Sequence, residues 1–243
     1  MSGPQIVILA GGLGTRLRPW TLERPKAMVE VGGRPFLERQ IRLVRSQGFR
    51  RFLVLGGYRM DQIRRHFRSG ERWGVSIKYR DDGEGLVGTA GALWQAVEEL
   101  DPWFLLLDGD SFLPIDFRGP VREFLARGLA GPGALMTVYR NRNRWSASNV
   151  EVAGGRVVRY ERGGRGLEDV HYGLSVVARR VVEGIGQAPG GRRVSLSLDA
   201  VWARLAGAGE LGAYRVRRRF YQIGDPAGLE DLEGYLRRSG LAT

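Results

Sequence analysis

A short apolar run at the start of the chain leads directly into a loop with three glycines, and this step restricts the fold more than any other feature. Residues 5–10 are almost continuously apolar, and residues 11–17 read Gly-Gly-Leu-Gly-Thr-Arg-Leu. A continuous apolar run of this length is typical of a strand buried on both faces of a parallel sheet. Glycine has no side chain, so backbone N–H groups of such a loop can approach phosphate oxygens. The sequence therefore predicts a buried parallel strand followed by a phosphate-binding loop.

Strand-like and helix-like segments then alternate through the first half of the chain. Short apolar runs predict strands, and apolar residues at helical spacing predict helices. The expected strands are residues 5–10, 52–55, 75–79 and 103–107, and the expected helices are residues 35–47, 60–67 and 89–100. This order predicts a three-layer α/β/α arrangement with a mostly parallel central sheet, in which ligands bind at the carboxyl ends of the strands.

The pattern changes at about residue 134. Short strands separated by glycine turns are expected at residues 134–139, 149–152, 156–161 and 172–177, followed by a helix at 194–205, a strand at 213–217 and a helix at 226–238. This half is expected to form a mixed β subregion. Because no polar linker or fixed-period repeat interrupts the 243 residues, we expect a single domain with two parts, residues 1–133 and 134–243.

Composition excludes several classes of protein. The chain has no cysteine, so thiol catalysis, Cys-ligated zinc, iron–sulfur clusters and disulfides are excluded. No apolar run approaches the roughly 20 residues that span a bilayer, and the first residues do not form a signal peptide. We therefore expect a soluble, cytoplasmic protein with no membrane partner.

The chain is strongly basic, with 38 Lys and Arg against 26 Asp and Glu, a net charge of +12. Only Lys26 and Lys78 are lysines, so almost all of the positive charge is arginine, whose guanidinium group suits phosphates. The arginines are scattered along the chain, and no helix-turn-helix, zinc-finger or RNP-like pattern accompanies them. The composition favours sites for anionic small molecules over a nucleic-acid partner.

Two familiar explanations of the glycine loop fail. A dinucleotide fingerprint that begins at Gly12 would need glycine or alanine at Leu17, and a P-loop would need Gly-Lys-Ser/Thr at its end. The loop, followed by Pro19, Thr21 and the segments 25–28 (Pro-Lys-Ala-Met) and 33–38 (Gly-Arg-Pro-Phe-Leu-Glu), instead resembles the signature of the sugar-1-phosphate nucleotidyltransferases. The resemblance implies a Rossmann-like fold that binds nucleotide in residues 1–133 and sugar phosphate in residues 134–243.

The resemblance implies that the loop binds a nucleoside triphosphate and that two cations beside it are catalytic. Arg16 and Lys26 would neutralise charge on the attacked α-phosphate and on the pyrophosphate leaving group. The alternatives are an arginine that caps the next turn and an ordinary surface lysine. The expected nucleotide-binding residues of the loop are Leu9, Ala10, Gly11, Gly12, Gly14 and Thr15.

Two carboxylates follow the apolar run 103–107. Asp108 and Asp110 would lie at the carboxyl end of a buried strand, where hard oxygens suit Mg²⁺. In the family that this sequence resembles, the second aspartate ligates the metal, so Asp110 is expected to be both catalytic and a magnesium ligand. Asp108 is placed with the nucleotide-binding residues. For either residue, the alternative is an Asx-turn that only ends the strand.

The second metal aspartate of the family is replaced in this chain. Gln222 stands in its place, and a carboxylate follows three residues later at Asp225. Either Gln222 supplies a neutral carbonyl ligand, or Asp225 reaches the metal, or Asp225 is the N-cap of a helix that begins at Pro226.

Further positions resemble the nucleobase and sugar segments of the family. Gly88 would allow close approach to the nucleobase, and Thr89 could cap a helix whose N-terminus faces it, unless this is a plain capped helix start. The expected sugar-phosphate-binding residues are Asn149, Glu161, Arg162, Tyr172 and Gly173. Asn149 and Tyr172 could equally be a strand-edge residue and a packing residue. His66 and His171 have no partner at metal or triad spacing, so we interpret them as structural or peripheral.

The resemblance implies an enzyme that joins a nucleoside triphosphate and a sugar 1-phosphate and releases pyrophosphate. The chain is most similar to the D-glycero-D-manno-heptose 1-phosphate guanylyltransferases, so GTP and a heptose or hexose 1-phosphate are the expected substrates. A hexose or N-acetylmuramate 1-phosphate enzyme that uses another triphosphate is an alternative. The missing aspartate leaves a nucleotide or nucleotide-sugar sensor on the same fold open, and a homo-oligomer is also left open.

Overall fold

The structure is a computed structural model that describes residues 3–83, 87–128, 131–185 and 196–241. The chain forms two compact units that interleave along the sequence. Unit 1 comprises residues 1–85, 107–114 and 220–243, and unit 2 comprises residues 86–106 and 115–219. The two parts expected from the sequence, 1–133 and 134–243, therefore do not coincide with the units.

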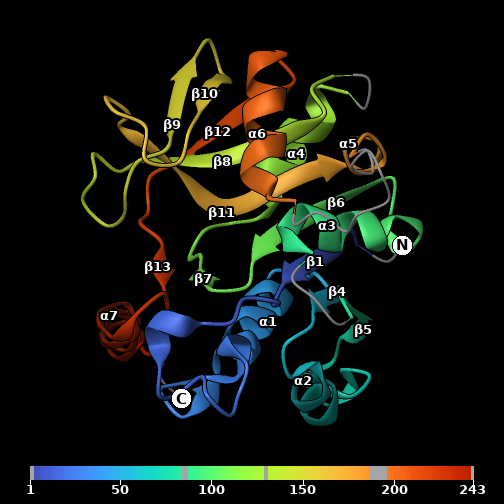
Figure 1. The fold of residues 1–243 in the computed structure, drawn as a ribbon, viewed down its shortest axis with the longest axis vertical. Helices are drawn as coiled ribbons and strands as arrows, with labels where there is room; N and C mark the ends of the chain where they lie inside the picture. The colour runs from blue at the N-terminus through green and yellow to red at the C-terminus, as the bar shows by residue number, and fades with distance from the viewer. Residues whose placement is uncertain (1–2, 84–86, 129–130, 186–195, 242–243) are drawn as a thin grey trace. The chain divides into compact units, whose positions relative to one another are not determined.

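Unit 1 is built on parallel strands in the order β5-β4-β1. β1 (Gln5–Leu9) pairs with β4 (Arg51–Gly56), and β4 pairs with β5 (Ser76–Asp81), each in parallel register. The last two residues of β6 (Trp103–Asp108) also belong to this unit. Figure 1 shows α1 (Phe36–Ser46) and α2 (Met60–Phe67) beside these strands. The carboxyl ends of the strands thus collect the glycine loop, Asp82 and residues 108–111 at one edge.

The remaining elements of unit 1 are short. β2 (Glu30–Val31) pairs with β3 (Arg34–Pro35), β7 (Ser111–Phe112) pairs with β13 (Tyr221–Gln222), and α7 (Pro226–Arg238) closes the chain. Three 3₁₀ turns complete the unit: η1 (Thr15–Leu17), η2 (Lys26–Met28) and η3 (Glu71–Trp73). A cluster of apolar residues packs α7 onto these strands: Val31, Phe36, Phe112, Tyr221, Ile223, Leu232 and Leu236. This cluster fixes the segment that carries Gln222.

Unit 2 contains a mixed sheet, as the sequence predicts. Its strands lie in the order β6-β11-β8-β12-β10-β9, where β11 (Asp169–Ala178) is antiparallel to β8 (Ala134–Arg140). β12 (Leu211–Val216) is parallel to β8, while β10 (Arg156–Tyr160) is antiparallel to both β12 and β9 (Val150–Ala153). The helices are α3 (Gly88–Gln95), α4 (Arg118–Ala126), α5 (Arg179–Glu183) and α6 (Leu198–Gly207), with the 3₁₀ turn η4 (Val97–Glu99) after α3. In Figure 1, α6 lies across the face of this sheet.

Two expected helices differ from those observed. The helix expected over residues 89–100 ends at Gln95, because the N–H of Ala96 bonds to the carbonyl of Leu93 and tightens the chain into η4. The helix expected from residue 194 begins at Leu198; residues 194 and 195 lie outside the described residues. Within the described ranges, no helix is long and apolar enough to cross a membrane.

Candidate active site

The glycine loop turns sharply after β1. Gly14 adopts φ 61° and precedes η1, and its carbonyl accepts a hydrogen bond of 2.7 Å from Thr21 Oγ1. A Cβ on Gly14 would lie 2.8 Å from Thr21 Cγ2 and 3.2 Å from Lys26 Cβ. Glycine is therefore required here both by the backbone conformation and by close packing. The loop carries Arg16, which is exposed, and brings the backbone of residue 14 against Lys26.

The other side of the loop lies against β4 and β5. A Cβ on Gly11 would lie 3.0 Å from Asp82 Oδ2 and 3.4 Å from Gly56 Cα. The N–H of Ala10 donates to the carbonyl of Leu55, which continues the strand pairing into the loop. By contrast, a Cβ on Gly12 would meet nothing within 4 Å. Gly11 is thus needed for packing within the protein, while the backbone at Gly12 is open.

The turn at residues 108–111 is held from two directions by backbone hydrogen bonds. The N–H of Gly109 donates to the carbonyl of Leu9 at 3.1 Å, and a Cβ on Gly109 would lie only 2.1 Å from that oxygen. On the other side, the N–H of Ile223 donates to the carbonyl of Asp110 at 3.0 Å. The turn that carries Asp110 is therefore fixed to both β1 and the segment after β13.

Lys26 and Asp110, 84 residues apart, form an ion pair. Lys26 Nζ lies 2.6 Å from Asp110 Oδ2, and the two side chains are 12% and 34% exposed. Ser111 Oγ donates to the other carboxylate oxygen at 3.1 Å. The structure thus brings together two of the three predicted catalytic residues. A shielded pair of this kind interacts more strongly than one in open water.

Gln222 and Arg16 lie at the same edge of unit 1. Gln222 is opposite Ser111 in the β7–β13 pairing, and its amide nitrogen donates to Ser111 Oγ at 3.2 Å. A Cβ on Gly224 would lie 3.3 Å from Arg16 Nη2, which places that guanidinium against the chain two residues beyond Gln222.

Asp225 is the N-cap of α7. Its Oδ1 accepts from the N–H of Gly228 at 2.9 Å, and Pro226 occupies the first helical turn. The structure confirms the sequence interpretation in which Asp225 caps the helix.

The residues around Asp110 fit a magnesium ion that arrives with a phosphate ligand. The donor set is one carboxylate, one serine hydroxyl and the side-chain amide of Gln222. Among the described residues, no group of three or more His, Cys, Asp or Glu side chains could hold a metal ion. Mg²⁺ is commonly bound through one or two carboxylates plus substrate phosphates, so this small set of hard oxygens suits it.

Asp82 is a candidate that sequence reasoning missed. It directly follows β5, and its Oδ1 is buried without a hydrogen-bond partner among the described residues. Burial, with a smaller contribution from Asp81, raises the pKa of this carboxyl to about 6. A perturbed carboxyl beside a ligand loop is characteristic of functional sites. The signal was available, because the carboxyl end of any parallel strand at this edge is a candidate position.

In unit 2, Gly88 and Thr89 contact the segment before α6. A Cβ on Gly88, which has φ +73°, would lie 2.3 Å from the carbonyl oxygen of Leu196. Thr89 Oγ1 accepts from the N–H of Leu198 at 2.9 Å, whereas the N-cap position of α3 is Val87. The expectation that Thr89 caps its own helix is therefore wrong; its hydroxyl holds the start of α6.

Two of the predicted sugar-side residues of unit 2, Arg162 and Asn149, are linked to Asp199 in the first turn of α6. Tyr160 donates its hydroxyl to Asp199 Oδ1 at 2.7 Å, and Arg162 Nε lies 3.5 Å from Asp199 Oδ2. Asn149 joins this group through Tyr160, at 3.4 Å, and also accepts from the N–H of His171. Glu161 instead pairs with Arg159 and is 53% exposed.

Tyr172 and Gly173 lie within β11. The Tyr172 side chain is fully buried, and its hydroxyl donates to the carbonyl of Arg219 at 3.2 Å. Gly173 has φ +102°, a conformation that favours glycine. The contacts of Tyr172 match the packing interpretation of this residue.

Both histidines contact neighbouring side chains of the protein. Ser175 Oγ lies 3.2 Å from His171 Nε2, and burial lowers the pKa of the His171 imidazole to about 4. His66 lies 3.7 Å from the buried carboxylate of Glu38. Burial opposes ionisation of Glu38, but hydrogen bonds from Arg42 and Arg34 outweigh it and hold the pKa of this carboxyl below its usual value.

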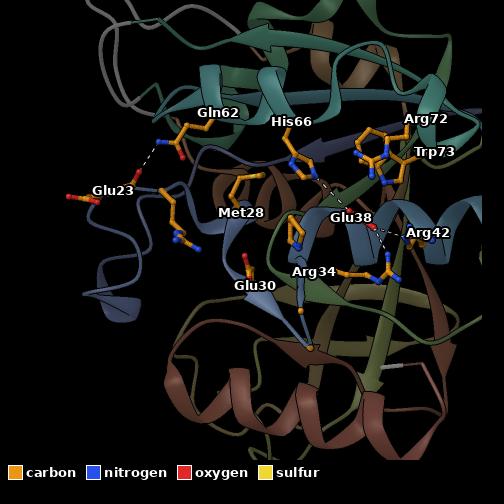
Figure 2. A pocket seen from close by; sticks show the side chains of 14 residues that line it. Glu23, Met28, Glu30, Arg34, Glu38, Arg42, Gln62, His66, Arg72 and Trp73 are labelled. Carbon is orange, nitrogen blue, oxygen red and sulfur yellow. Dashed lines mark hydrogen bonds and ion pairs between the residues drawn. The ribbon is translucent and has the colours of Figure 1, made fainter. Parts of the chain in front are cut away.

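Glu38 and His66 line a pocket of about 790 Å³ in unit 1. Figure 2 shows the side chains around it, with Glu38 from α1 joined to Arg34 and Arg42 and facing His66 of α2. None of the residues predicted to be catalytic, nucleotide-binding, sugar-phosphate-binding or metal-binding lines this pocket, whereas Met28 and residues 33–35 and 38 of the signature segments do.

The fold is shared with a protein from Bacillus anthracis whose proposed assignment is glucose-1-phosphate thymidylyltransferase. The two chains superpose with a TM-score of 0.84 over 96% of this chain and 95% of the other, at 19% sequence identity. This likeness defines a Rossmann-like α/β fold of the nucleotidyltransferase type. Residues 5–148 match the family model described as nucleotidyl transferase, and the chain belongs to this family.

Two sequence relatives match about half of the chain. A D-glycero-alpha-D-manno-heptose 1-phosphate guanylyltransferase from Campylobacter jejuni is 35% identical over 112 residues, which cover 46% of this chain and 50% of the relative. A UTP–glucose-1-phosphate uridylyltransferase from Synechocystis is 32% identical over 134 residues, 50% of this chain and 34% of the relative. The matched segments thus span a third to a half of these relatives.

Proposed function

We propose that the protein transfers a nucleotidyl group from a nucleoside triphosphate to a sugar 1-phosphate. One observation carries the proposal: the ammonium group of Lys26 lies 2.6 Å from the carboxylate of Asp110, beside a glycine loop at the carboxyl ends of parallel strands. A cation and a carboxylate placed together suit a triphosphate and the divalent ion that accompanies it. Family membership and the names of the relatives support the same reaction class.

In the proposed reaction, an oxygen of the sugar 1-phosphate attacks the α-phosphorus in line. The new P–O bond forms as the bond to pyrophosphate breaks, so no covalent enzyme nucleophile is needed. Lys26 and Arg16 bind the charged oxygens and orient the triphosphate, and the open backbone at Gly12 provides N–H groups to the phosphates. Catalysis then comes from positioning and charge neutralisation.

Asp110 is the residue proposed to hold magnesium, with the side-chain oxygen of Gln222 as a neutral second ligand. When bound, the ion offsets phosphate charge and polarises the attacked phosphorus. Lys26 balances the Asp110 carboxylate when no metal is bound, and it is free to turn to phosphate when the carboxylate meets a cation. Asp225 is engaged as a helix cap, which favours Gln222 for the second position.

The first substrate pair to test is GTP with a heptose or hexose 1-phosphate. The proposal rests on the Campylobacter relative, while the Synechocystis relative favours UTP and a hexose. The sugar would bind in unit 2 near Glu161 and Arg162, where Asp199 holds the arginine.

The deciding experiment is a pyrophosphate-release screen of each nucleoside triphosphate against a panel of sugar 1-phosphates with Mg²⁺. Release is expected only when the triphosphate, the sugar 1-phosphate and the divalent ion are all present. A clear preference for UTP, CTP or dTTP would overturn the guanine assignment and keep the reaction class. If no pair reacts, the transferase proposal fails.

Gln222 favours a second candidate, a nucleotide or nucleotide-sugar sensor with weak catalysis. An amide replaces the carboxylate expected at this position, which lowers the negative charge available to a divalent ion. The variant Gln222→Asp distinguishes the two candidate functions. If the wild type binds nucleotide but does not react, and Gln222→Asp gains Mg²⁺-dependent turnover, the protein is a sensor. If both react, Gln222 serves as a ligand and the transferase proposal holds.

A further inference from the structure

Gln40 of α1 lies beneath the turn that carries Asp110. Its amide nitrogen donates to two carbonyl oxygens, those of Asp108 and Ser111, at 2.9 Å each. These residues stand on either side of the Gly109-Asp110 pair, so one side chain joins the start and the end of the turn. Gln40 is 1% exposed, which keeps water from replacing either bond.

The chemistry of the two partners fixes the orientation of this amide. Carbonyl oxygens only accept hydrogen bonds, so the nitrogen must face them and the oxygen must point away. The Gln40 oxygen is buried and has no hydrogen-bond partner among the described residues. A buried acceptor without a partner costs free energy, and the two hydrogen bonds of the amide nitrogen offset that cost by satisfying the carbonyl oxygens of Asp108 and Ser111. The contribution of Gln40 is therefore specific to the geometry of this turn.

We infer that Gln40 is a positioning residue that sets the geometry of Asp110 for the reaction, an inference that rests on the proposed function. Backbone bonds hold Gly109 to β1 and Asp110 to Ile223, but neither of them spans the turn. Gln40 closes it, and the closed turn directs the Asp110 carboxylate toward Lys26. Without the two amide bonds the turn can relax, and the carboxylate then meets phosphate and cation in a distribution of positions.

The test compares Gln40→Met with Ile41→Val. Methionine matches glutamine in length but donates no hydrogen bond, and Ile41 is a fully buried neighbour on the same helix. For Gln40→Met we expect kcat to fall at least tenfold with the KM of both substrates within threefold, and Mn²⁺ binding without substrate, measured by electron paramagnetic resonance, to weaken at least threefold. Ile41→Val should lower the melting temperature and leave kcat and Mn²⁺ binding unchanged. Wild-type kcat and Mn²⁺ affinity in Gln40→Met would overturn the inference.

A second variant covers the case in which Gln40→Met does not fold. In Gln40→Glu the neutral carboxylic acid can donate one of the two bonds, whereas the ionised form would face two carbonyl oxygens. Its kcat relative to the wild type should therefore fall at least threefold as the pH rises through the titration of the new carboxyl. A ratio independent of pH and close to one would overturn the inference.

The inference and the proposed function fail in different ways. If the wild type reacts with no substrate pair, the proposed function fails, and the Mn²⁺ affinity and a crystal structure of Gln40→Met still test the turn. An unchanged 108–111 turn in that structure, together with unchanged Mn²⁺ affinity, would contradict the positioning role.

Discussion

The cluster around Asp110 in unit 1 and the cluster around Asp199 in unit 2 hold their cations differently. The Lys26 side chain is 12% exposed and contacts its carboxylate at 2.6 Å, whereas Arg162 is 83% exposed and lies 3.5 Å from Asp199. A shielded charge acts through a lower dielectric and needs little reorganisation, while an exposed one is screened by water. Under the proposed function, we therefore expect unit 1 to stabilise charge during the reaction and unit 2 to contribute to binding of the sugar phosphate.

The largest effect is expected from Asp110→Asn. The variant removes the carboxylate that faces Lys26 and would attract the divalent ion, so Mg²⁺-dependent turnover should fall by about 10³ or more. The amide can still accept from Lys26, so the free energy of unfolding should change by no more than about 2 kcal/mol. Pyrophosphate-release assays and thermal unfolding check both parts, with Asp61→Asn, an exposed carboxylate, as control. Normal turnover in Asp110→Asn would contradict a catalytic role for this cluster of unit 1.

The next effect is expected from Lys26→Ala and Arg16→Ala. Loss of one well-placed charge donor costs about 3 to 4 kcal/mol of transition-state stabilisation, so kcat should fall by about 10² to 10³ in each variant. Arg16 is exposed and Lys26 is shielded, so the Lys26 variant should be the slower of the two. Arg18→Ala, an exposed arginine of the same loop, is the matched control. Wild-type rates in all three variants would show that neither Lys26 nor Arg16 contributes to turnover.

The difference between the two clusters predicts that a substitution in unit 2 changes substrate binding more than turnover. Arg162→Ala should raise the KM for sugar 1-phosphate by about tenfold, the value of one charge-assisted hydrogen bond, and leave kcat within about threefold. Steady-state kinetics measures both values, and Arg165→Ala serves as an exposed control nearby. A loss in kcat with unchanged KM would contradict the division of roles between the units.

Local signals in the sequence predicted much of the fold. The helix expected over residues 226–238 is found at those positions because Asp225 and Pro226 form a start signal that needs no distant partner. The helix over residues 60–67 is also found as expected, because its buried Met60, Ile63 and Phe67 recur at helical spacing. The residues that specify these two helices lie within each helix or next to it.

Contacts between distant segments could not be read in the same way. The β7–β13 pairing places Gln222 beside Ser111, and the Gln40 amide bridges a turn about 70 residues away. These contacts depend on the register of packed elements, which one sequence does not specify. The ion pair of Lys26 with Asp110 was expected only as two residues of one site, and the burial of Asp82 gave no local signal beyond its place after a strand.

A smaller effect is expected from Asp225→Ala. The variant loses the side-chain bond to the N–H of Gly228, so the free energy of unfolding should fall by about 1 kcal/mol. Turnover and its Mg²⁺ dependence should stay as in the wild type, because the proposed second ligand is Gln222. Thermal unfolding and kinetics check this in parallel. Lost activity at an unchanged melting temperature would instead make Asp225 the ligand.

The smallest effect concerns Asp82 and extends the comparison to a half-buried carboxyl whose Oδ1 has no hydrogen-bond partner among the described residues. Burial raises its pKa from 3.8 to about 6, so the folded state binds the proton more tightly than the unfolded state. Near pH 3 both states are protonated and the group has no effect. Between pH 4 and 6 stability falls as the pH rises, and above pH 6 the full penalty is present.

Asp82→Asn removes this penalty, so the variant should gain stability over the wild type at pH 7.5 and show little gain at pH 4. The side chain is only partly buried, so solvent screening reduces the gain to about 1 kcal/mol. Melting temperatures measured across this pH range check the sign, with the exposed Glu71→Gln as control. A gain that is independent of pH would mean that the Asp82 carboxyl titrates normally and that unit 1 does not shield it.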